Sequence, residues 1–294
     1  MQTSLSRSRL SRAPTEPASR PFAARLARPA IFIGVYGLLA AGAWRLPAAT
    51  WNAAFTALVL LVLWELYALV ALRSRLLRGV GLAASALLLL QPLLAPALPG
   101  TLILSAAWIC CLALVSLSTA RPRRRELHGV LLMVCGLFAV TLALGQLVAI
   151  RYLAGGREWT TLVILAVAAR ESTAALGGLV FPGAPVINER VSPRKSYAGW
   201  ALGAAASIAA AVVLARAWGL AVTTGQAVVL GLAIGAACQL GDLSESYLKR
   251  VMGRRHSGRA LGPQGGLLDT TDALAFAAVV AHGLLLAWGL GARP

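Results

Sequence analysis

The sequence predicts an all-α integral membrane protein with about nine transmembrane helices, its N-terminus in the cytoplasm and its C-terminus outside. The chain of 294 residues is 59% hydrophobic and 13% charged, well below the roughly 25% charged residues of soluble domains. Runs of about 18 to 20 apolar residues recur along nearly the whole chain, and each could cross a bilayer. The connections between these runs are also alternately rich and poor in basic residues along the chain.

The first 28 residues differ in composition from the rest of the chain. Residues 1–28 contain six arginines and one glutamate among serine, proline and alanine. Such a segment cannot bury enough apolar surface to fold alone, so we expect a basic, disordered cytoplasmic tail. A signal peptide is the alternative, but further apolar runs follow without a clear cleavage site. Residues 29–294 are expected to form one polytopic membrane domain.

The expected spans and the basic residues between them agree on one topology. The spans cover residues 29–47, 52–72, 79–99, 101–119, 129–150, 159–180, 199–217, 220–241 and 273–290. With the N-terminus inside, the inside segments hold 21 lysines and arginines and the outside segments five, with Arg170 left within a span. We therefore interpret the net charge of +17 as a record of topology in the cell membrane and of contact with anionic membrane lipids, and we expect no nucleic-acid partner.

The rare charged residues are concentrated in two connections that we expect on the cytoplasmic side, residues 182–198 and 242–272. Only two lysines accompany 25 arginines, and the chain has three aspartates; these residues are Lys195, Lys249, Asp242, Asp269 and Asp272. A lysine kept where arginine is otherwise used suggests a compact ammonium group that binds phosphate. The two connections therefore form a candidate active site.

Helical spacing predicts how the second connection is organised. A helix that continues past residue 241 places Asp242, Glu245, Ser246 and Lys249 on one face. Glycines then interrupt the helix, and two aspartates follow where the last span begins. Carboxylates could hold Mg²⁺ while lysine and arginine neutralise phosphate charge. The alternative is that these charges are ordinary interfacial residues that anchor loops.

These residues resemble the signature of the phosphatidate cytidylyltransferases, also called CDP-diacylglycerol synthases. The similar positions are Ser246, Lys249, Arg250, Gly253, Ser257, Gly258, Gly265, Gly266, Asp269 and Asp272, preceded by Gly-Asp-Leu-x-Glu at 241–245. A second element of that family resembles Ser192, Pro193, Lys195, Ser196 and Gly199.

The resemblance implies transfer of a cytidylyl group from CTP to phosphatidate, giving CDP-diacylglycerol and pyrophosphate. It implies Mg²⁺ as cofactor, with Asp242 and Asp269 as metal ligands. The catalytic residues that it implies are Ser246, Lys249, Arg250 and Asp272. The substrate-binding residues are Ser192, Lys195, Ser196, Gly265 and Gly266. The partners are CTP, phosphatidate and membrane lipids, and a homodimer is an open alternative.

The sequence also departs from the pattern of that family. A Lys-Asp pair is replaced by Arg255 and His256, a loop histidine by Gln264, an arginine by Thr270, a glutamate by Ala198, and an Asn-Asp pair by Arg170 and Glu171. Glutamine cannot transfer a proton as histidine does. Two alternatives therefore stay open: another CTP-dependent lipid transferase or kinase, and a non-catalytic membrane homologue.

Three charged residues lie well inside expected spans, away from the span ends. Arg170 and Glu171 are adjacent in one span, where an ionisable pair indicates either a functional site or a self-neutralising contact between helices. Glu65 lies in the second span, and we expect it to be a structural hydrogen-bonding group.

Overall fold

The computed structural model describes residues 22–70, 72, 74–94, 124–188, 192–254, 256–258, 260–261 and 265–290. The expected span 101–119 lies outside these residues, as does most of the expected tail, residues 1–21. Within the described residues the first helix begins at Phe22, ahead of the expected start at residue 29.

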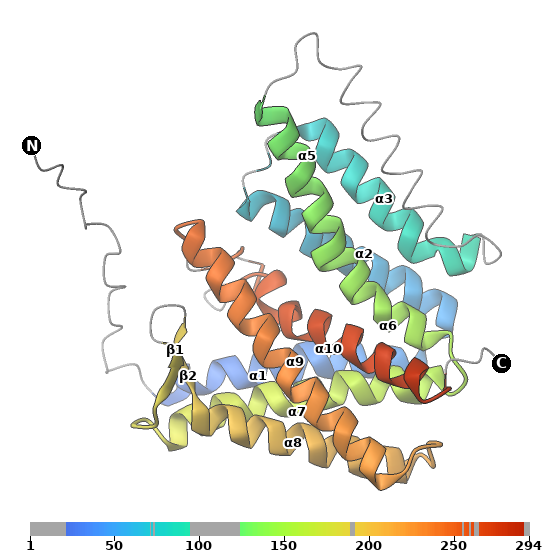
Figure 1. Ribbon diagram of the computed structural model, residues 1–294, viewed down its shortest axis with the longest axis vertical. Helices are drawn as coiled ribbons and strands as arrows, with labels where there is room; N and C mark the ends of the chain where they lie inside the picture. Colours follow the sequence, from blue (N-terminus) through green and yellow to red (C-terminus); the bar gives the residue numbers. More distant parts are fainter. Residues whose placement is uncertain are drawn as a thin grey trace, which may run out of the picture.

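The described part of the chain is mainly helical (Figure 1). Its helices are α1 (Phe22–Arg45), α2 (Ala48–Leu69), α3 (Arg75–Leu94), α5 (Arg124–Gly136), the π-helix η1 (Leu137–Leu142), α6 (Ala143–Arg151), α7 (Gly156–Val180), α8 (Tyr197–Ala217), α9 (Thr224–Val251) and α10 (Leu268–Ala287). Seven segments of this part are long and apolar enough to span a membrane, with α5, η1 and α6 providing one of them. The apolar part of α1, Pro29–Arg45, is shorter. The fold is that of a helical multi-pass membrane protein.

A short β-hairpin departs from the expected all-helical fold. Strands β1 (Val186–Asn188) and β2 (Ser192–Ser196) pair antiparallel, with Val186 opposite Ser196 and Asn188 opposite Ser192. The residues of β2, Ser-Pro-Arg-Lys-Ser, carry no alternating apolar pattern, so local propensity did not predict a strand. Strand β2 packs against α7, α8 and α9, and these tertiary contacts hold it in place.

Local capping residues begin helices α8 and α9. Thr223 and Gln226 form a capping box at the start of α9, in which each side chain accepts a hydrogen bond from the backbone N–H of the other residue. The Ser196 hydroxyl caps α8 by accepting from the Gly199 N–H at 3.1 Å. The hairpin therefore passes directly into α8.

Helix α10 connects two groups of helices (Figure 1). On one side, α9 packs along α10, α8 packs against α7 and α9, and α1 packs against α7. On the other side, α2 contacts α3, α5 and η1. Helix α10 contacts α6, α7 and α9 as well as α2. Its first turn lies where both groups meet, because Leu268 bonds to α2 and Asp269 pairs with α9.

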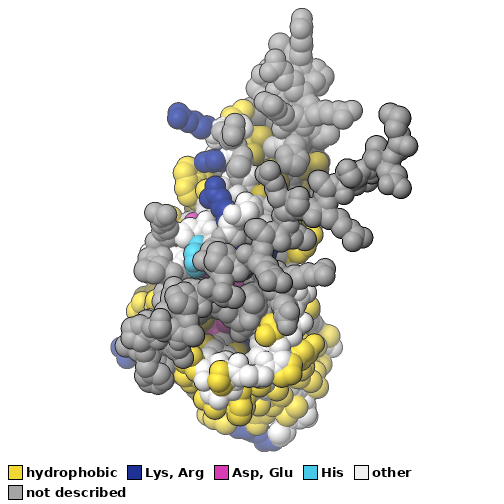
Figure 2. All heavy atoms as spheres, turned by 90° about the vertical axis from the view of Figure 1, so that its left-hand side faces the viewer, with side chains coloured by type: hydrophobic (Ala, Val, Ile, Leu, Met, Phe, Trp, Pro, Cys, Tyr) yellow, Lys and Arg dark blue, Asp and Glu magenta, His cyan; other side chains and the backbone are white. Residues whose placement is uncertain are grey.

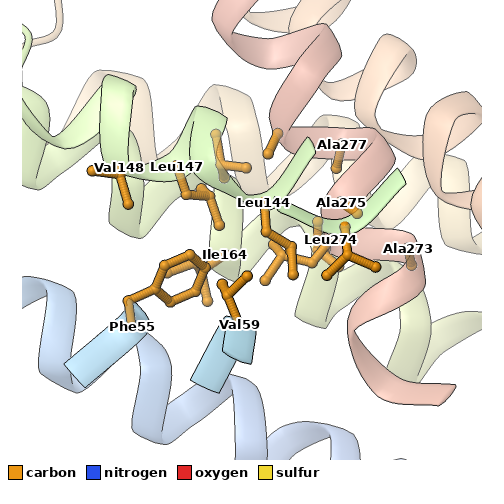
Figure 3. Packing of buried hydrophobic residues seen from close by; sticks show 14 of the residues in the cluster. Phe55, Val59, Leu144, Leu147, Val148, Ile164, Ala273, Leu274, Ala275 and Ala277 are labelled. Carbon is orange, nitrogen blue, oxygen red and sulfur yellow. The ribbon is translucent and has the colours of Figure 1, made fainter. Parts of the chain in front are cut away.

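The core between α2, α6, α7 and α10 consists of interlocking apolar side chains (Figure 3). Phe55, Val59, Leu144, Ile164 and Leu274 are all fully buried there. Lipid tails are as apolar as these side chains, so close packing and not the exclusion of water holds the helices together in a membrane.

Small residues bring α8 and α9 into close contact. A Cβ atom on Gly231 would lie 2.5 Å from the Ile208 Cα and 2.8 Å from the Ser207 carbonyl oxygen. Both of these are backbone atoms, so they cannot move away as a flexible side chain could. The Ser207 hydroxyl also donates to the Gly231 carbonyl at 2.8 Å. The interface thus depends on a glycine at this position.

We predict that Gly231→Ala lowers the free energy of unfolding by about 1 to 3 kcal/mol, because the added methyl group forces α8 and α9 apart. The matched control is Gly283→Ala on α10, where a Cβ meets nothing within 4 Å and alanine should be neutral or stabilising by about 1 kcal/mol. Thermal unfolding in detergent measures both. Equal effects at the two positions would contradict this account.

Candidate active site

A buried guanidinium organises the first of two charged clusters. Arg170 on α7 is only 1% exposed, and its Nη1 contacts the Glu171 carboxylate and lies 2.7 Å from Asp242 Oδ2 on α9. Its Nη2 donates to Gln239 Oε1 at 2.6 Å. Lys195 of β2 forms an ion pair with the same Asp242 oxygen. We call these five residues the Asp242 cluster.

A second cluster surrounds Asp269 in the first turn of α10. Its Oδ1 lies 2.5 Å from the Lys249 ammonium, which also pairs with Glu245 one turn earlier on α9. Its Oδ2 accepts from the Ser257 N–H and hydroxyl, both at 3.0 Å, and from the Gly266 N–H at 2.8 Å. Helix α9 thus carries groups of both clusters on one face, as the spacing predicted. We call these five residues the Asp269 cluster.

The two consecutive glycines let the chain pass close to carboxylates. Gly265 has a φ of 123°, a conformation that side chains other than glycine rarely adopt. A Cβ on Gly265 would lie 2.9 Å from the Asp269 Cγ, and one on Gly266 would overlap the Glu65 carboxylate. Any larger residue would push the loop away from both acids.

Asp272 lies one turn further along α10, beside the Asp242 cluster. Its side chain is 8% exposed, and its Oδ1 accepts from the Ala273 N–H at 2.8 Å. Asp272 lies within electrostatic range of Asp242, Lys195 and Glu171, but the described residues place no cation in ion-pair contact with it. The Tyr36 hydroxyl lies close by and donates to the Thr270 carbonyl at 2.5 Å.

Acids outnumber bases in this region. The carboxylates are those of Glu65, Glu171, Asp242, Glu245, Asp269 and Asp272. Among the described residues, their lysine and arginine partners are Arg170, Lys195 and Lys249. One Glu245 oxygen is buried without a hydrogen-bond partner in the described part of the chain. With all of these acids ionised, the described side chains of this region carry surplus negative charge, which burial penalises.

A bound divalent cation could compensate this surplus negative charge. No group of three or more His, Cys, Asp or Glu side chains is gathered in the described ranges as a complete metal site. Mg²⁺, however, takes one or two protein carboxylates and completes its shell with waters and substrate phosphates. The unpartnered Glu245 oxygen and Asp272, which makes no ion-pair contact within the described residues, fit a divalent cation of that kind. Asp242 and Asp269, the expected ligands, each hold a lysine and belong to separate clusters.

The remaining expected site residues lie around these clusters. Ser192 is buried at the start of β2, Ser196 caps α8, and Ser246 is half-buried on α9. Arg250 is exposed in the last turn of α9. The same end of the molecule faces the viewer in Figure 2, where lysine and arginine side chains project and acidic ones show only as small patches.

Of the positions where the sequence departs from the family pattern, some lie in the described ranges. His256 Nδ1 lies 3.9 Å from Asp269 Oδ2, so a half-exposed imidazole borders the Asp269 cluster. The Thr270 hydroxyl lies 3.4 Å from the Gly266 carbonyl. Ala198 is half-buried at the start of α8. Arg255 and Gln264 lie outside the described residues.

Sequence reasoning left three residues of the site without a role in it: Glu65, Tyr36 and Gln239. Glu65 was expected to be a hydrogen-bonding group, and it does accept hydrogen bonds, but from the glycine-rich loop of the site. An isolated acid in an apolar span was the available signal. Tyr36 and Gln239 carried no such signal, because polar residues of these types are common at membrane interfaces.

The helices and the two clusters define a multi-pass membrane protein with a charged site at one end of its bundle. The chain belongs to the Cytidylyltransferase family, whose model matches residues 26–288. That match includes α1 from residue 26 and nearly all of the other described elements.

Several curated proteins are similar to this chain. A phosphatidate cytidylyltransferase of Brucella abortus is 33% identical over 126 residues, which cover 42% of this chain and 46% of that protein. Phosphatidate cytidylyltransferase 5, chloroplastic, of Arabidopsis thaliana is 26% identical over 211 residues, covering 64% and 52%. One from Mycobacterium leprae is 33% identical over 123 residues, covering 42% and 39%. The chain spans about half the length of the curated relatives it matches.

We predict that Arg170→Met lowers the free energy of unfolding by about 3 to 5 kcal/mol, because Glu171 is left buried without its ion-pair partner. Adding Glu171→Gln should recover part of this loss. Arg157→Met, an exposed control on the same helix, should change it by less than about 0.5 kcal/mol. Denaturant unfolding in detergent measures all three. A double variant no more stable than Arg170→Met would refute the pairing.

Proposed function

We propose that this protein transfers a cytidylyl group from CTP to phosphatidate, giving CDP-diacylglycerol and pyrophosphate. The observation that carries the proposal is that the family match over residues 26–288 coincides with the convergence of Lys195, Asp242, Lys249 and Asp269 at one end of the bundle. The relatives named above are phosphatidate cytidylyltransferases, which supports this acceptor.

The reaction forms one bond and breaks one. An oxygen of the lipid phosphate attacks the α-phosphorus of CTP, and the bond between the α-phosphorus and the bridging oxygen to the β-phosphorus breaks. The attacking oxygen is already an anion, so no strong general base is required. Bound Mg²⁺ would neutralise charge on the phosphates of CTP and on the leaving pyrophosphate. The catalytic demand on the protein is therefore positioning and charge compensation.

The two clusters divide this work. Asp242 and Asp269 would hold Mg²⁺, and Asp272 would support them from the same end of α10. Lys249 is 13% exposed and held by two acids, so it could exchange one acid for a phosphate oxygen. Arg250, on the next position of α9, would bind the leaving phosphates, and Ser246 would contribute a hydroxyl one turn before it.

The hairpin and the glycine pair would bind the substrates. Lys195 is 19% exposed beside Asp242, and Ser192 and Ser196 lie on the same strand, where they would position the nucleotide or the lipid headgroup. Gly265 and Gly266 bring the backbone close to the acids, as a loop that approaches phosphate must.

We further propose the finer topology. Nine spans with the N-terminus inside and the C-terminus outside place this site on the cytoplasmic face of the cell membrane, where CTP is available. The helix ends that the basic residues assign to the inside include the ends of α2, α7 and α9 and the starts of α8 and α10. Side chains of α2, α7, α9 and α10 interact at this end, which supports the assignment. Anionic lipids would contact the basic segments there, and a homodimer is compatible with the proposal.

We predict that the purified protein in detergent forms CDP-lipid from CTP and phosphatidate, that a chelator stops the reaction and that Mg²⁺ restores it. Asp269→Asn should lower kcat by about 100- to 1,000-fold, because Lys249 would lose one of its two charged partners and the metal would lose a ligand. Glu158→Gln, in the first turn of α7, is the control and should retain activity.

Product that persists in Asp269→Asn would contradict the assigned site. A folded wild-type protein without product would contradict phosphatidate as the acceptor. A panel of other lipid phosphates and prenols, tested with CTP, would then separate a related lipid transferase or kinase from a non-catalytic homologue.

We predict opposite accessibility for Gly183→Cys, between α7 and β1, and Gly219→Cys, between α8 and α9, in a background without the native cysteines. In intact cells a membrane-impermeant maleimide should label Gly219→Cys, and it should label Gly183→Cys only after lysis. Both positions are exposed loop glycines, so the two variants control for each other. Labelling of Gly183→Cys in intact cells would contradict the proposed topology.

A further inference from the structure

Glu65 of α2 connects the group of helices formed by α2, α3, α5 and η1 to the glycine-rich loop between α9 and α10. It lies in the last turns of α2 among apolar residues, and its side chain is half-buried. Its Oε2 accepts from the Leu268 N–H of α10 at 3.0 Å and lies 3.5 Å from the Ser257 hydroxyl. These contacts join α2 to Ser257 in the loop between α9 and α10 and to the first residue of α10.

Helix α10 has no local cap of its own. Its N-cap residue is Leu267, whose side chain makes no capping hydrogen bond. The first backbone N–H groups of a helix lack acceptors within the helix. Here Glu65 accepts from Leu268 and Asp269 accepts from Gly266, so a distant acid completes the cap. The positive end of the helix dipole favours both carboxylates.

The loop is shaped to fit this carboxylate. A Cβ on Gly258 would lie 2.5 Å from Glu65 Oε1, and one on Gly266 would lie 2.8 Å from its Cδ. For Gly258, the nearest atoms to an added Cβ all belong to Glu65. For Gly266, they belong to Glu65 and to the Ser257 hydroxyl. The backbone therefore closes around the side chain from two directions.

Ser257 links Glu65 to the Asp269 cluster. Its hydroxyl lies 3.0 Å from Asp269 Oδ2 and 3.5 Å from Glu65 Oε2, and it has one proton to donate. Its backbone N–H donates to Asp269 as well. Any shift of Glu65 would thus move donors that hold Asp269, whose other oxygen pairs with Lys249.

We propose that Glu65 is a positioning residue for the cytidylyl transfer proposed above: without touching substrate, it holds Ser257, Gly258, Gly266 and Leu268 so that Asp269 and Lys249 would face the phosphates and the metal. The kinetic effect of this inference depends on the proposed function, whereas its structural effect on the loop does not. A glutamate that served only as a hydrogen-bonding group within its own helix would not be enclosed by two glycines and the N-terminus of another helix.

Hydrogen–deuterium exchange in detergent tests the structural part. In Glu65→Ala, the amides of residues 265–268 should exchange about tenfold faster or more, because Leu268 loses its acceptor. Glu65→Gln keeps an oxygen acceptor and should restore part of the protection. Glu158→Gln, an acid at the start of α7, should leave these amides unchanged. Unchanged protection in Glu65→Ala would overturn the inference, whether or not the protein is active.

Kinetics test the positioning role. Glu65→Ala should raise the Mg²⁺ concentration for half-maximal activity and the KM for CTP about tenfold each, with Glu65→Gln in between. A merely structural loss would lower the folded fraction and the yield and leave both constants unchanged, which would overturn the role. If Glu65→Ala does not fold, the comparison of Glu65→Gln with wild type provides the same test. An inactive wild type would contradict the proposed function and leave the exchange result as the test of Glu65.

Discussion

The Arg170 guanidinium bonds to Glu171 on its own helix and to Gln239 and Asp242 on α9, and Lys195 reaches the same Asp242 oxygen from β2. A charge without a partner is costly inside a bilayer, so these contacts restrict how α7, α9 and the hairpin can be placed. A rotation of α9 that removed Asp242 would leave the fully buried guanidinium with less compensation. The register of the surrounding helices therefore depends on this one group.

The second constraint is the close approach of backbone to carboxylate at the start of α10. Asp269 and Glu65 accept from Ser257, Gly266 and Leu268, so the acids hold the loop by hydrogen bonds to its backbone and to a hydroxyl. Such bonds specify the loop shape more tightly than apolar contacts, because direction matters as well as distance. The loop, in turn, keeps Asp269 beside Lys249.

Surplus negative charge links this architecture to the proposed chemistry. A site for CTP and a divalent cation has to accommodate an anion and a metal together, and its charges must be balanced both before and after binding. In the free protein, ion pairs such as Lys249 with Glu245 and Asp269 offset part of this negative charge. Where the sequence departs from the family pattern, it changes this balance: Arg170 adds a buried cation, and His256 adds one only when protonated.

Local sequence patterns determined the membrane class, most of the helices and the residues that carry charge into the site. Apolar runs and Gly and Pro residues act within a few positions, so the expected spans 159–180 and 199–217 agree with α7 and α8 to within about three residues. Helix α9, however, continues ten residues past the expected end at 241, and α10 begins five residues before the expected start at 273. Helical spacing likewise placed Asp242, Glu245 and Lys249 on one face of α9. The hairpin was missed because its strands are held by contacts with other helices.

Only the tertiary structure decided which acid meets which base. Lys195 pairs with Asp242 and Lys249 with Asp269, and Glu65 joins the site from a helix almost 200 residues away in the chain. The partner of a buried charge depends on how helices distant in sequence pack, and that packing comes from side-chain fit summed over whole interfaces. Composition and periodicity report only what each segment buries, so they identify the charged residues of this protein but not their pairing.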